Sequence, residues 1–307
     1  MVRVSSTITF YMNGTSIGTL SYSGTLGANA AAMNIGALGS PHASGYFGGY
    51  MAELRVSDSA RYTADFTPST DPFTSDVNTM LLIQSNTTMG STTFTDSSSG
   101  SHTVTANGDV MNIAPKIGVG MGGFDGTGDY LSIPDSSDWD FSAADFTVEF
   151  WVTFTAINSY NALVGHNYDS AGQKGWFIRY NSSGTTLLFR YVTDGSTEND
   201  LTADVGTLVV DTWYHVAITR QSTNIRFYLD GVQKDTGGIS TNIISDPVQP
   251  LVIGSYYSAS PTHNLDGFID ELRISRTCRY LDGTTFTPSA TAFKDDKDTV
   301  LLMHMDG

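Results

Sequence analysis

Short runs of alternating apolar and polar residues, broken by glycine-rich turns, extend along most of the chain. Between residues 146 and 155 the two alternating sets are Phe146, Val148, Phe150, Val152 and Phe154 against Thr147, Glu149, Thr153 and Thr155. This two-residue period predicts a β-strand with one buried face. Residues 214–219 and 225–229 alternate in the same way, and Asp230-Gly231 supplies the positive φ angles of a tight hairpin turn. No helical periodicity separates these runs, so we predict an all-β protein built as an antiparallel β-sandwich.

The chain repeats itself. FYMNG at 10–14 returns as FYLDG at 227–231, and GYMAELRVS at 49–57 returns as GFIDELRIS at 267–275. Further blocks follow in the same order, with offsets that drift only from 217 to 220 residues. We therefore predict the C-terminal part of a first unit at 1–75, a complete unit at 76–290, and a linker with the first strand of a following unit at 291–307.

The first segment poses a packing problem. Its strands carry an apolar face, but residues 1–75 include no second sheet to cover that face. We expect this segment to need a docking surface, either on the complete unit or on another chain.

Composition narrows the partners. Lys and Arg number 15 against 31 Asp and Glu, so the net charge is −16, which repels nucleic acid and anionic membranes. The single cysteine, Cys278, excludes an intrachain disulfide. No run of about 18 apolar residues predicts a membrane span, and the first residues resemble a strand rather than a signal peptide.

Five ordered segments resemble a known family. They are GGFDGTGDYLSIP at 122–134, FTVEFWV at 146–152, TWYHVAITR at 212–220, RFYLDG at 226–231 and DGFIDELRIS at 266–275. Together they resemble the laminin G-like, concanavalin A-like jelly-roll domain, in the tandem form found in bacterial surface and phage virion proteins. The resemblance implies two antiparallel sheets, often a calcium site near one sheet edge, and most often carbohydrate binding or adhesion. It also implies a location that is extracellular, on a cell surface or on a virion.

Calcium is the cofactor that these residues favour. Asp125 and Asp129 lie among flexible glycines in FDGTGD, and calcium prefers carboxylate and carbonyl oxygens. The resemblance places this turn near the strand that carries Asp270, so we predict a metal site of Asp125, Asp129 and Asp270. The alternative is that the two turn aspartates only accept hydrogen bonds from the turn backbone.

Two loops carry side chains of the kinds that bind sugars, and we take them as candidates. Each directly follows a strand that ends in glycine, so both are expected at a sheet rim, where rings stack on sugars and amides or carboxylates bind hydroxyls. The candidates are His166, Asn167, Tyr168, Asp169, Tyr256, Tyr257 and Asn264. The alternative is that these tyrosines only cover strand ends.

Three functions remain open. The favoured one is a non-enzymatic module that binds a surface glycan; the second is a structural protein of a virion or cell surface that packs on neighbouring subunits. A glycoside hydrolase is the minor alternative, because Asp270 and Glu271 are adjacent and should point to opposite faces of their strand. The first copy has Ala52 in place of Asp270 but keeps Glu53 and Arg55, which suggests that Glu271 and Arg273 are structural, as cross-strand ion partners.

Overall fold

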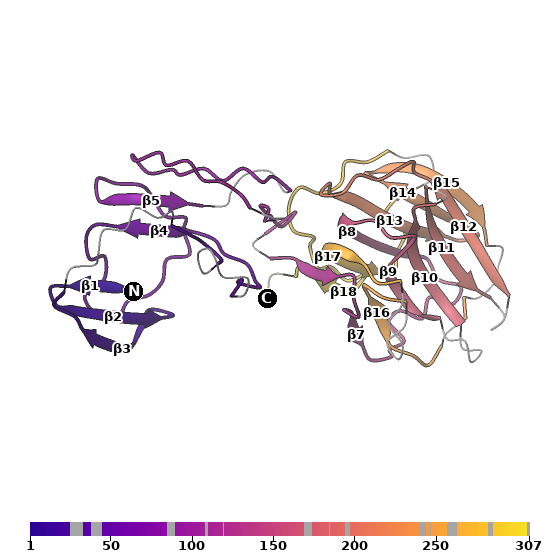
Figure 1. Cartoon of the computed structure of the whole chain (residues 1–307). Helices are drawn as coiled ribbons and strands as arrows, with labels where there is room; N and C mark the ends of the chain where they lie inside the picture. Colours follow the sequence, from indigo (N-terminus) through magenta and orange to yellow (C-terminus); the bar gives the residue numbers. More distant parts are fainter. Residues whose placement is uncertain are drawn as a thin grey trace. The chain divides into compact units, whose positions relative to one another are not determined.

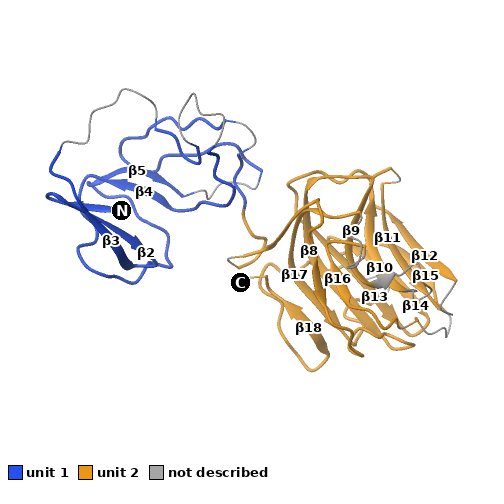
Figure 2. Cartoon of the chain, turned by 60° about the horizontal axis from the view of Figure 1, so that its bottom comes forward, with its two compact units in different colours: residues 1–113 blue, residues 114–307 orange. Residues whose placement is uncertain are grey.

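The computed structural model covers residues 1–307. It describes all of them except 25–32, 38–44, 85–89, 108–109, 119, 169–173, 184, 194–196, 240–243, 246, 257–262, 282–284, 306–307 and the side chains of 167, 168 and 174. The described residues form strands and no helix, so none of them belongs to a helix that could cross a membrane. The prediction of an all-β antiparallel sandwich is confirmed. The chain divides into two compact units, unit 1 at residues 1–113 and unit 2 at 114–307 (Figure 2).

Unit 2 is a sandwich of two sheets (Figure 1). The six-stranded sheet has the order β12-β11-β10-β9-β16-β7, formed by β7 (Leu131–Ile133), β9 (Tyr160–Tyr168), β10 (Lys174–Asn181), β11 (Thr186–Val192), β12 (Glu198–Asp204) and β16 (Leu251–Ile253). The seven-stranded sheet has the order β15-β14-β13-β8-β17-β18, with β6 also on β17. Its strands are β6 (Gly122–Asp125), β8 (Phe146–Ala156), β13 (Tyr214–Gln221), β14 (Asn224–Leu229), β15 (Val232–Gly238), β17 (Asp266–Ser275) and β18 (Thr299–Met303).

The inner faces of the two sheets form one apolar core. The predicted apolar face of β8 is fully buried there, together with Trp176 and Phe189 from the six-stranded sheet and Phe227 from β14. Phe141 stacks on Phe146 with a centroid distance of 4.0 Å and closes one end of this core. Burying a large side chain contributes about 1.5–3 kcal/mol, so the alternating apolar positions are the main source of stability.

The outer face of the seven-stranded sheet is also covered. Residues 276–281 and 285–296, which we call the strap, cross this face, and in them Tyr280 stacks on Phe286 at 3.6 Å. The strap is held by Phe286 N–H, which donates to the carbonyl oxygen of Gly231. As a result Thr147, Glu149 and Thr153 are buried. The expectation that β8 buries only one face was wrong, because the strap is distant in the sequence and its contact leaves no local pattern.

Unit 1 repeats the second half of unit 2. It consists of β1 (Val2–Val4), β2 (Thr7–Met12), β3 (Thr15–Ser21), β4 (Leu54–Ser57) and β5 (Thr79–Ile83). The pairing register is the same in both copies: Val2 opposes Thr9 as Thr219 opposes Arg226, and Leu54 opposes Ile83 as Leu272 opposes Met303.

The repeated hairpin turn has a steric reason. Asn13 and Gly14 have φ angles of 50° and 79°, and Asp230 and Gly231 have 49° and 75°, as the tight turn requires. A Cβ atom on either glycine would lie 1.8 Å from a carbonyl oxygen, that of Phe66 or that of Phe286. Only glycine fits at both turns, because the backbone of the strap lies against Gly231 and the backbone at Phe66 lies against Gly14.

The sheet of unit 1 is split. In unit 2, β8 lies between β13 and β17 and joins them. In the described part of unit 1, no strand joins β1 to β4, so one sheet becomes two, β1-β2-β3 and β4-β5.

The unit boundary also differs from the expected breaks at 75/76 and 290/291, because β5 pairs with β4 and β18 pairs with β17. Each of these strands therefore closes the sheet that precedes it in the chain.

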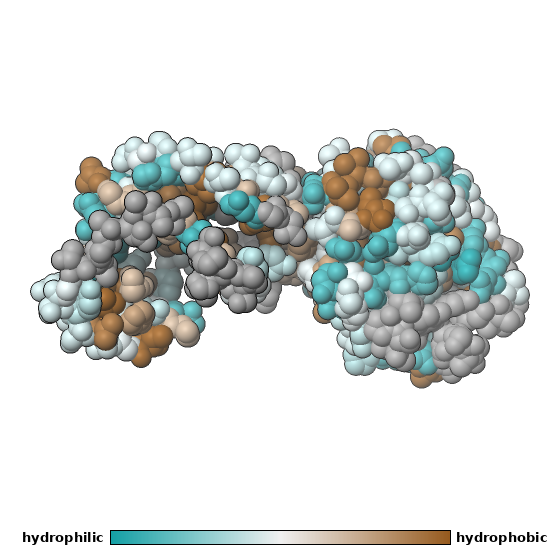
Figure 3. All heavy atoms as spheres, viewed as in Figure 1, coloured by the Kyte–Doolittle hydropathy of each residue, from teal (hydrophilic) through white to brown (hydrophobic). Residues whose placement is uncertain are grey.

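Unit 1 exposes side chains that unit 2 buries. Phe10 and Met12 are 41% and 63% exposed, whereas their counterparts Phe227 and Leu229 are 0% and 6% exposed. Apolar side chains accordingly gather on the surface of the β1–β3 sheet (Figure 3). The hairpin keeps its conformation in both copies, but among the described residues an opposing sheet covers it in unit 2 and not in unit 1.

Candidate functional site

The carboxylates of β17 lie on the strap side of the sheet. A bulge between Asp270 and Arg273 shifts the register against β8, and Glu271 adopts a positive φ of 52°. Asp270 and Glu271 are 0% and 1% exposed, and the Glu271 carboxylate accepts a hydrogen bond from Phe293 N–H at 2.6 Å. The bulge therefore places both adjacent carboxylates on the outer side of the sheet, Glu271 against the strap and Asp270 against Ile117, which simple alternation does not predict. Buried there, they reach no surface at which a sugar could bind.

Glu149 forms the centre of a buried ionic cluster. Its carboxylate accepts hydrogen bonds from Arg273 at 2.9 and 2.6 Å and from the Tyr280 hydroxyl at 2.6 Å, and His215 Nε2 lies 3.3 Å away. Burial alone would raise the pKa of Glu149, but His215, Arg273 and Tyr280 outweigh it and hold the pKa below its usual value. Arg273 is thus a structural cross-strand ion partner, as expected, and its partner is Glu149.

The predicted calcium site does not fit the geometry. Asp125 Oδ1 accepts from Thr127 N–H at 2.7 Å and Asp129 Oδ2 accepts from Asp125 N–H at 3.1 Å, as in an ordinary aspartate turn. Asp125 opposes Asp266 on β17, four residues away from Asp270. No group of three or more His, Cys, Asp or Glu side chains that could hold a metal ion occurs among the described residues. We therefore assign no calcium-dependent step.

Asp270 is a buried acid with a shifted pKa. Its Oδ2 accepts a hydrogen bond from Ile117 N–H at 2.9 Å, and the side chain is fully buried. Burial, assisted by the neighbouring charge of Glu271, raises the pKa of Asp270 to about 6. An unfolded aspartate loses its proton near pH 4, so folding binds this proton more tightly. Ionisation of Asp270 therefore lowers the stability of unit 2 as the pH rises from about 4 to above 6.

Replacing Asp270 by asparagine is expected to stabilise unit 2 at pH 8 by about 1–3 kcal/mol, because the neutral amide avoids the buried negative charge. The gain should shrink toward zero near pH 4, where the aspartate is protonated in both states. The measurement is urea unfolding followed by tryptophan fluorescence, which reports unit 2 because Trp139, Trp151, Trp176 and Trp213 all lie in it.

The same unfolding curves, recorded with calcium and with EDTA, separate the two roles of Asp270. If Asp270 held calcium, D270N would lose stability in calcium only. A loss of stability that is equal at pH 4 and pH 8 would contradict the buried-charge account, since it would show that the amide disturbs the packing.

The residues predicted to bind a sugar at the sheet rim lie in different environments. His166 is fully buried, and its Nε2 lies 3.0 Å from the carbonyl oxygen of Gln249 and 3.2 Å from Asp135, so it supports the sheet rather than a ligand. Asp169, Tyr257 and the side chains of Asn167 and Tyr168 lie outside the described residues. Asn264 is half-buried. Tyr256 is 9% exposed and lies on the outer face of the six-stranded sheet.

Around Tyr256 the outer face of this sheet gathers rings and one cation. On β10, Trp176, Ile178 and Tyr180 point into the core, so Phe177 and Arg179 point outward. Tyr160 comes from the start of β9, and Tyr256 and His263 come from the chain between β16 and β17. We call Tyr160, Phe177, Arg179, Tyr256 and His263 the aromatic surface.

The members of the aromatic surface are in close contact. The Arg179 guanidinium lies 4.5 Å from the Tyr160 ring centroid and donates a hydrogen bond to the Tyr256 hydroxyl at 2.9 Å. His263 meets the Tyr160 and Tyr256 rings at 5.1 and 5.2 Å, and Tyr256 meets Phe177 at 4.5 Å. Burial, with a smaller effect of Arg179, lowers the pKa of His263, so this ring is neutral at pH 7.

A second arginine adjoins the aromatic surface. Arg190 on β11 donates to Asp200 at 2.6 and 2.7 Å and to Glu198 at 2.5 Å, both on β12. These hydrogen bonds raise the pKa of Arg190 above its already high value. Both guanidinium groups, of Arg179 and Arg190, lie 5.8 Å from the Phe177 ring. The surface therefore combines aromatic rings with several hydrogen-bonding groups, which is the chemistry of sugar recognition.

Sequence reasoning found only Tyr256 of this set. The signal that it overlooked is in residues 174–181, where an aromatic ring and an arginine occupy the face opposite Trp176, Ile178 and Tyr180. When a strand packs one face into the core and still carries large side chains on its outer face, the pattern indicates a binding surface on that outer face. Tyr160 and His263 gave no local signal, because only the fold brings them to β10.

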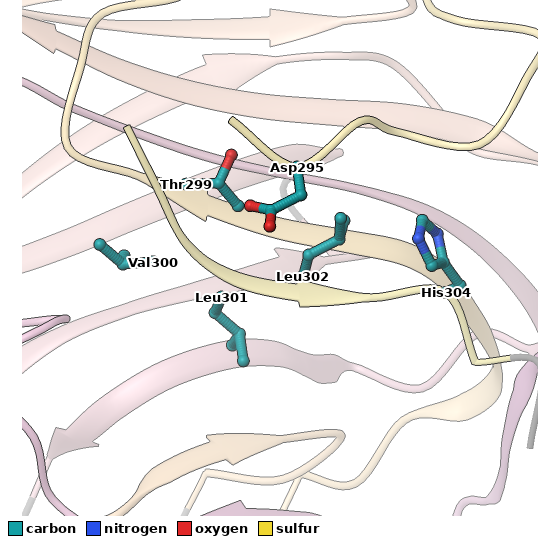
Figure 4. Close-up of a pocket in the computed structure, with 6 residues that line it drawn as sticks. All are labelled: Asp295, Thr299, Val300, Leu301, Leu302 and His304. Atoms are coloured by element: carbon teal, nitrogen blue, oxygen red, sulfur yellow. The ribbon is translucent and has the colours of Figure 1, made fainter. Parts of the chain in front are cut away.

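A shallow pocket lies along β18, at the edge of the seven-stranded sheet (Figure 4). Its lining is Asp295, Thr299, Val300, Leu301, Leu302 and His304. The His304 ring contacts the Glu271 carboxylate at 2.7 Å, which leaves mostly aliphatic side chains to contact a ligand. This pocket offers little specific chemistry.

Comparison with known proteins agrees with this fold. Residues 125–281, which are 157 of the 307, match the laminin G model of the concanavalin A-like lectin/glucanases superfamily. The chain belongs to this superfamily. The laminin G-like match ends at the start of the strap and includes every residue of the aromatic surface.

Individual relatives of the laminin G-like unit are distant. Adhesion G-protein coupled receptor V1 of Danio rerio is 27% identical over 139 residues, which are 44% of this chain and 2% of the receptor. A carbohydrate binding protein described as putative, from Bacteroides ovatus, is 14% identical with a TM-score of 0.43, over 69% of this chain and 58% of its own. Domains LG4-5 of the mouse laminin alpha1 chain are 15% identical with a TM-score of 0.38, over 58% and 46%.

Proposed function

We propose that unit 2 is a non-enzymatic carbohydrate-binding module that acts in adhesion outside the cell, at a cell or virion surface. The observation that carries this proposal is the aromatic surface, where rings and hydrogen-bonding groups from three parts of the chain converge on one sheet face. Membership of a superfamily of lectins and glucanases supports it.

The binding mechanism follows from the side chains. The exposed parts of Tyr160 and His263 offer ring faces on which the apolar face of a sugar can lie, while Arg179 and Arg190 with its two acids offer donors and acceptors for hydroxyl groups. An exposed site of this kind binds weakly when alone. Repeated units in one molecule would raise the overall affinity through effective concentration.

Replacing Tyr160 by alanine is expected to weaken glycan binding about 5–20-fold, because one stacking surface and the support of Arg179 are lost. The measurement is binding of the whole chain to a glycan array, followed by titration of the best ligand. Val232→Ala is the matched control, since Val232 is 44% exposed but lies on β15 of the other sheet.

Equal losses of glycan affinity in Tyr160→Ala and Val232→Ala would mean that the sugar binds outside the aromatic surface. Silence of the folded parent chain across the array would overturn the proposed function itself. Unchanged thermal unfolding of both variants would show that a binding loss is not a folding defect.

A second candidate function is packing in an assembly, and the split sheet of unit 1 favours it. In the part of unit 1 that the structure describes, no strand pairs with β1 and β4 on the edges where unit 2 inserts β8, and the adjoining β2 exposes Phe10 and Met12. We propose that this face is covered by a polypeptide equivalent to residues 114–217 of unit 2, which supplies both the joining strand and the opposing sheet.

The test of this second function is to supply that polypeptide. Residue 1 corresponds to residue 218 by the register of the two hairpins, so residues 114–217 can be fused directly ahead of Met1. In the fusion, replacing Phe10 by alanine should lower the free energy of unfolding as much as replacing Phe227 does in unit 2. No gain in protection of β2 from hydrogen exchange would overturn the proposal.

A further inference from the structure

The Arg179 guanidinium is held in place without a negative partner. No carboxylate forms an ion pair with it among the residues that the structure describes, and its one hydrogen bond there is that from Nη1 to the Tyr256 hydroxyl. A guanidinium has five N–H groups, so most of its donors remain for a ligand. Its Nε is buried and lacks a partner in this part of the chain.

Arg190 on the adjacent strand shows the contrast. Asp200 and Glu198 both bind Arg190, so the charge of that arginine is already neutralised. Arg179 instead lies against rings, with centroids at 4.5 Å for Tyr160, 5.8 Å for Phe177 and 5.9 Å for Tyr256. These contacts fix the orientation of the guanidinium and leave its charge available. The chain has a net charge of −16, yet among the carboxylates that the structure describes none forms an ion pair with this cation.

We propose that Arg179 makes unit 2 selective for an acidic saccharide, one whose carboxylate or sulfate group binds the guanidinium while its sugar ring lies on the neighbouring aromatic rings. A guanidinium held in one plane matches either anion with two parallel hydrogen bonds. This inference rests on the proposed carbohydrate binding and names the class of sugar.

The net charge limits the ligand further. An acidic surface repels a polyanion, so a glycan that carries a charge on every repeat would pay an electrostatic cost at each additional group. Arg179 provides one cation, and the neutral His263 adds none at pH 7. The expected ligand is therefore a short glycan, or a glycan end, with a single acidic group.

The test uses three probes with one sugar core: lactose, 3′-sialyllactose and lactose 3′-sulfate, alongside an array that pairs neutral glycans with acid-capped versions. The parent chain should bind the acidic member of a pair at least 10-fold more tightly than the neutral one. In R179Q this preference should fall to below about twofold, and R179K should keep part of it. K234Q is the matched control, because it removes one exposed positive charge from β15 of the other sheet, and it should keep most of the preference.

The outcomes separate the two proposals. If the parent chain binds neutral and acidic members equally, or if R179Q keeps the preference, the acidic selectivity is wrong and the carbohydrate-binding function stands. If the folded chain binds no glycan, both fail. A preference that weakens as sodium chloride rises from 50 to 500 mM supports the ionic contact. If the carboxylate probe binds and the sulfate probe does not, the ligand is a sugar acid.

Discussion

Replacing Arg273 by methionine is expected to lower the free energy of unfolding of unit 2 by about 3–5 kcal/mol, because it leaves a buried carboxylate without its main cation. Arg273 donates two hydrogen bonds to Glu149, which is fully buried beneath the strap. Methionine fills much of the same volume, so the loss reports the charge rather than a cavity. The measurement is urea unfolding at pH 7, followed by tryptophan fluorescence.

The pH dependence of this loss identifies its cause. The depressed pKa of Glu149 means that its contribution to stability is present above the unfolded pKa and is lost as the pH falls through the folded pKa. Without Arg273 the carboxylate can take up a proton, so the difference between parent and variant should narrow below about pH 4.5. A difference that stays constant from pH 7 to pH 3.5 would contradict the ionic explanation.

A double-mutant cycle provides the control. E149Q removes the negative charge, and the combined E149Q and R273M change removes both charges. The coupling energy between the two positions should be on the order of 2 kcal/mol, since the single changes each leave a buried partner unsatisfied and the double change does not. Additive effects would show that the two side chains stabilise the unit independently.

Some of this architecture could be derived from the sequence, because its signals are local. The alternation in residues 146–154 correctly gave the core-facing side of β8, and the Asn-Gly and Asp-Gly pairs gave the two hairpin turns. The correspondence of the two copies also followed from the sequence, since identical turn chemistry produces the same register.

Other features depend on contacts between distant segments. The strap buries Glu149 from more than 120 residues away, so a polar strand face became a second buried face. The bulge at Glu271 changed which side chains share a face of β17, and no residue type in this strand predicts a bulge. The aromatic surface combines β9, β10 and the chain before β17, which only the fold brings together. Tyr256 was predicted because it directly follows a strand, whereas Arg179, in the middle of a strand, was missed.

The two copies of the hairpin allow one substitution to be made in two environments. Phe227→Ala is expected to destabilise unit 2 by about 3–5 kcal/mol, because Phe227 is fully buried in the sandwich core. Phe10→Ala is expected to cost less than about 1 kcal/mol, because the same side chain is 41% exposed in unit 1. Both can be measured by hydrogen exchange of the backbone amides in β2 and β14.

Comparing Phe10→Ala with Phe227→Ala also tests whether the exposed face of β2 needs an opposing sheet. Both phenylalanines lie directly before the same bulge and the same tight turn, so the hairpin itself contributes equally to both measurements. When residues 114–217 are fused ahead of Met1, the cost of Phe10→Ala should rise to that of Phe227→Ala, since the fused segment supplies the strand between β1 and β4 and the sheet opposite Phe10. Equal costs in the unfused chain, at all protein concentrations, would mean that the exposed face contributes to the stability of unit 1 already. A cost that stays small in the fusion would mean that the two hairpins, although alike in register, do not belong to the same kind of sandwich.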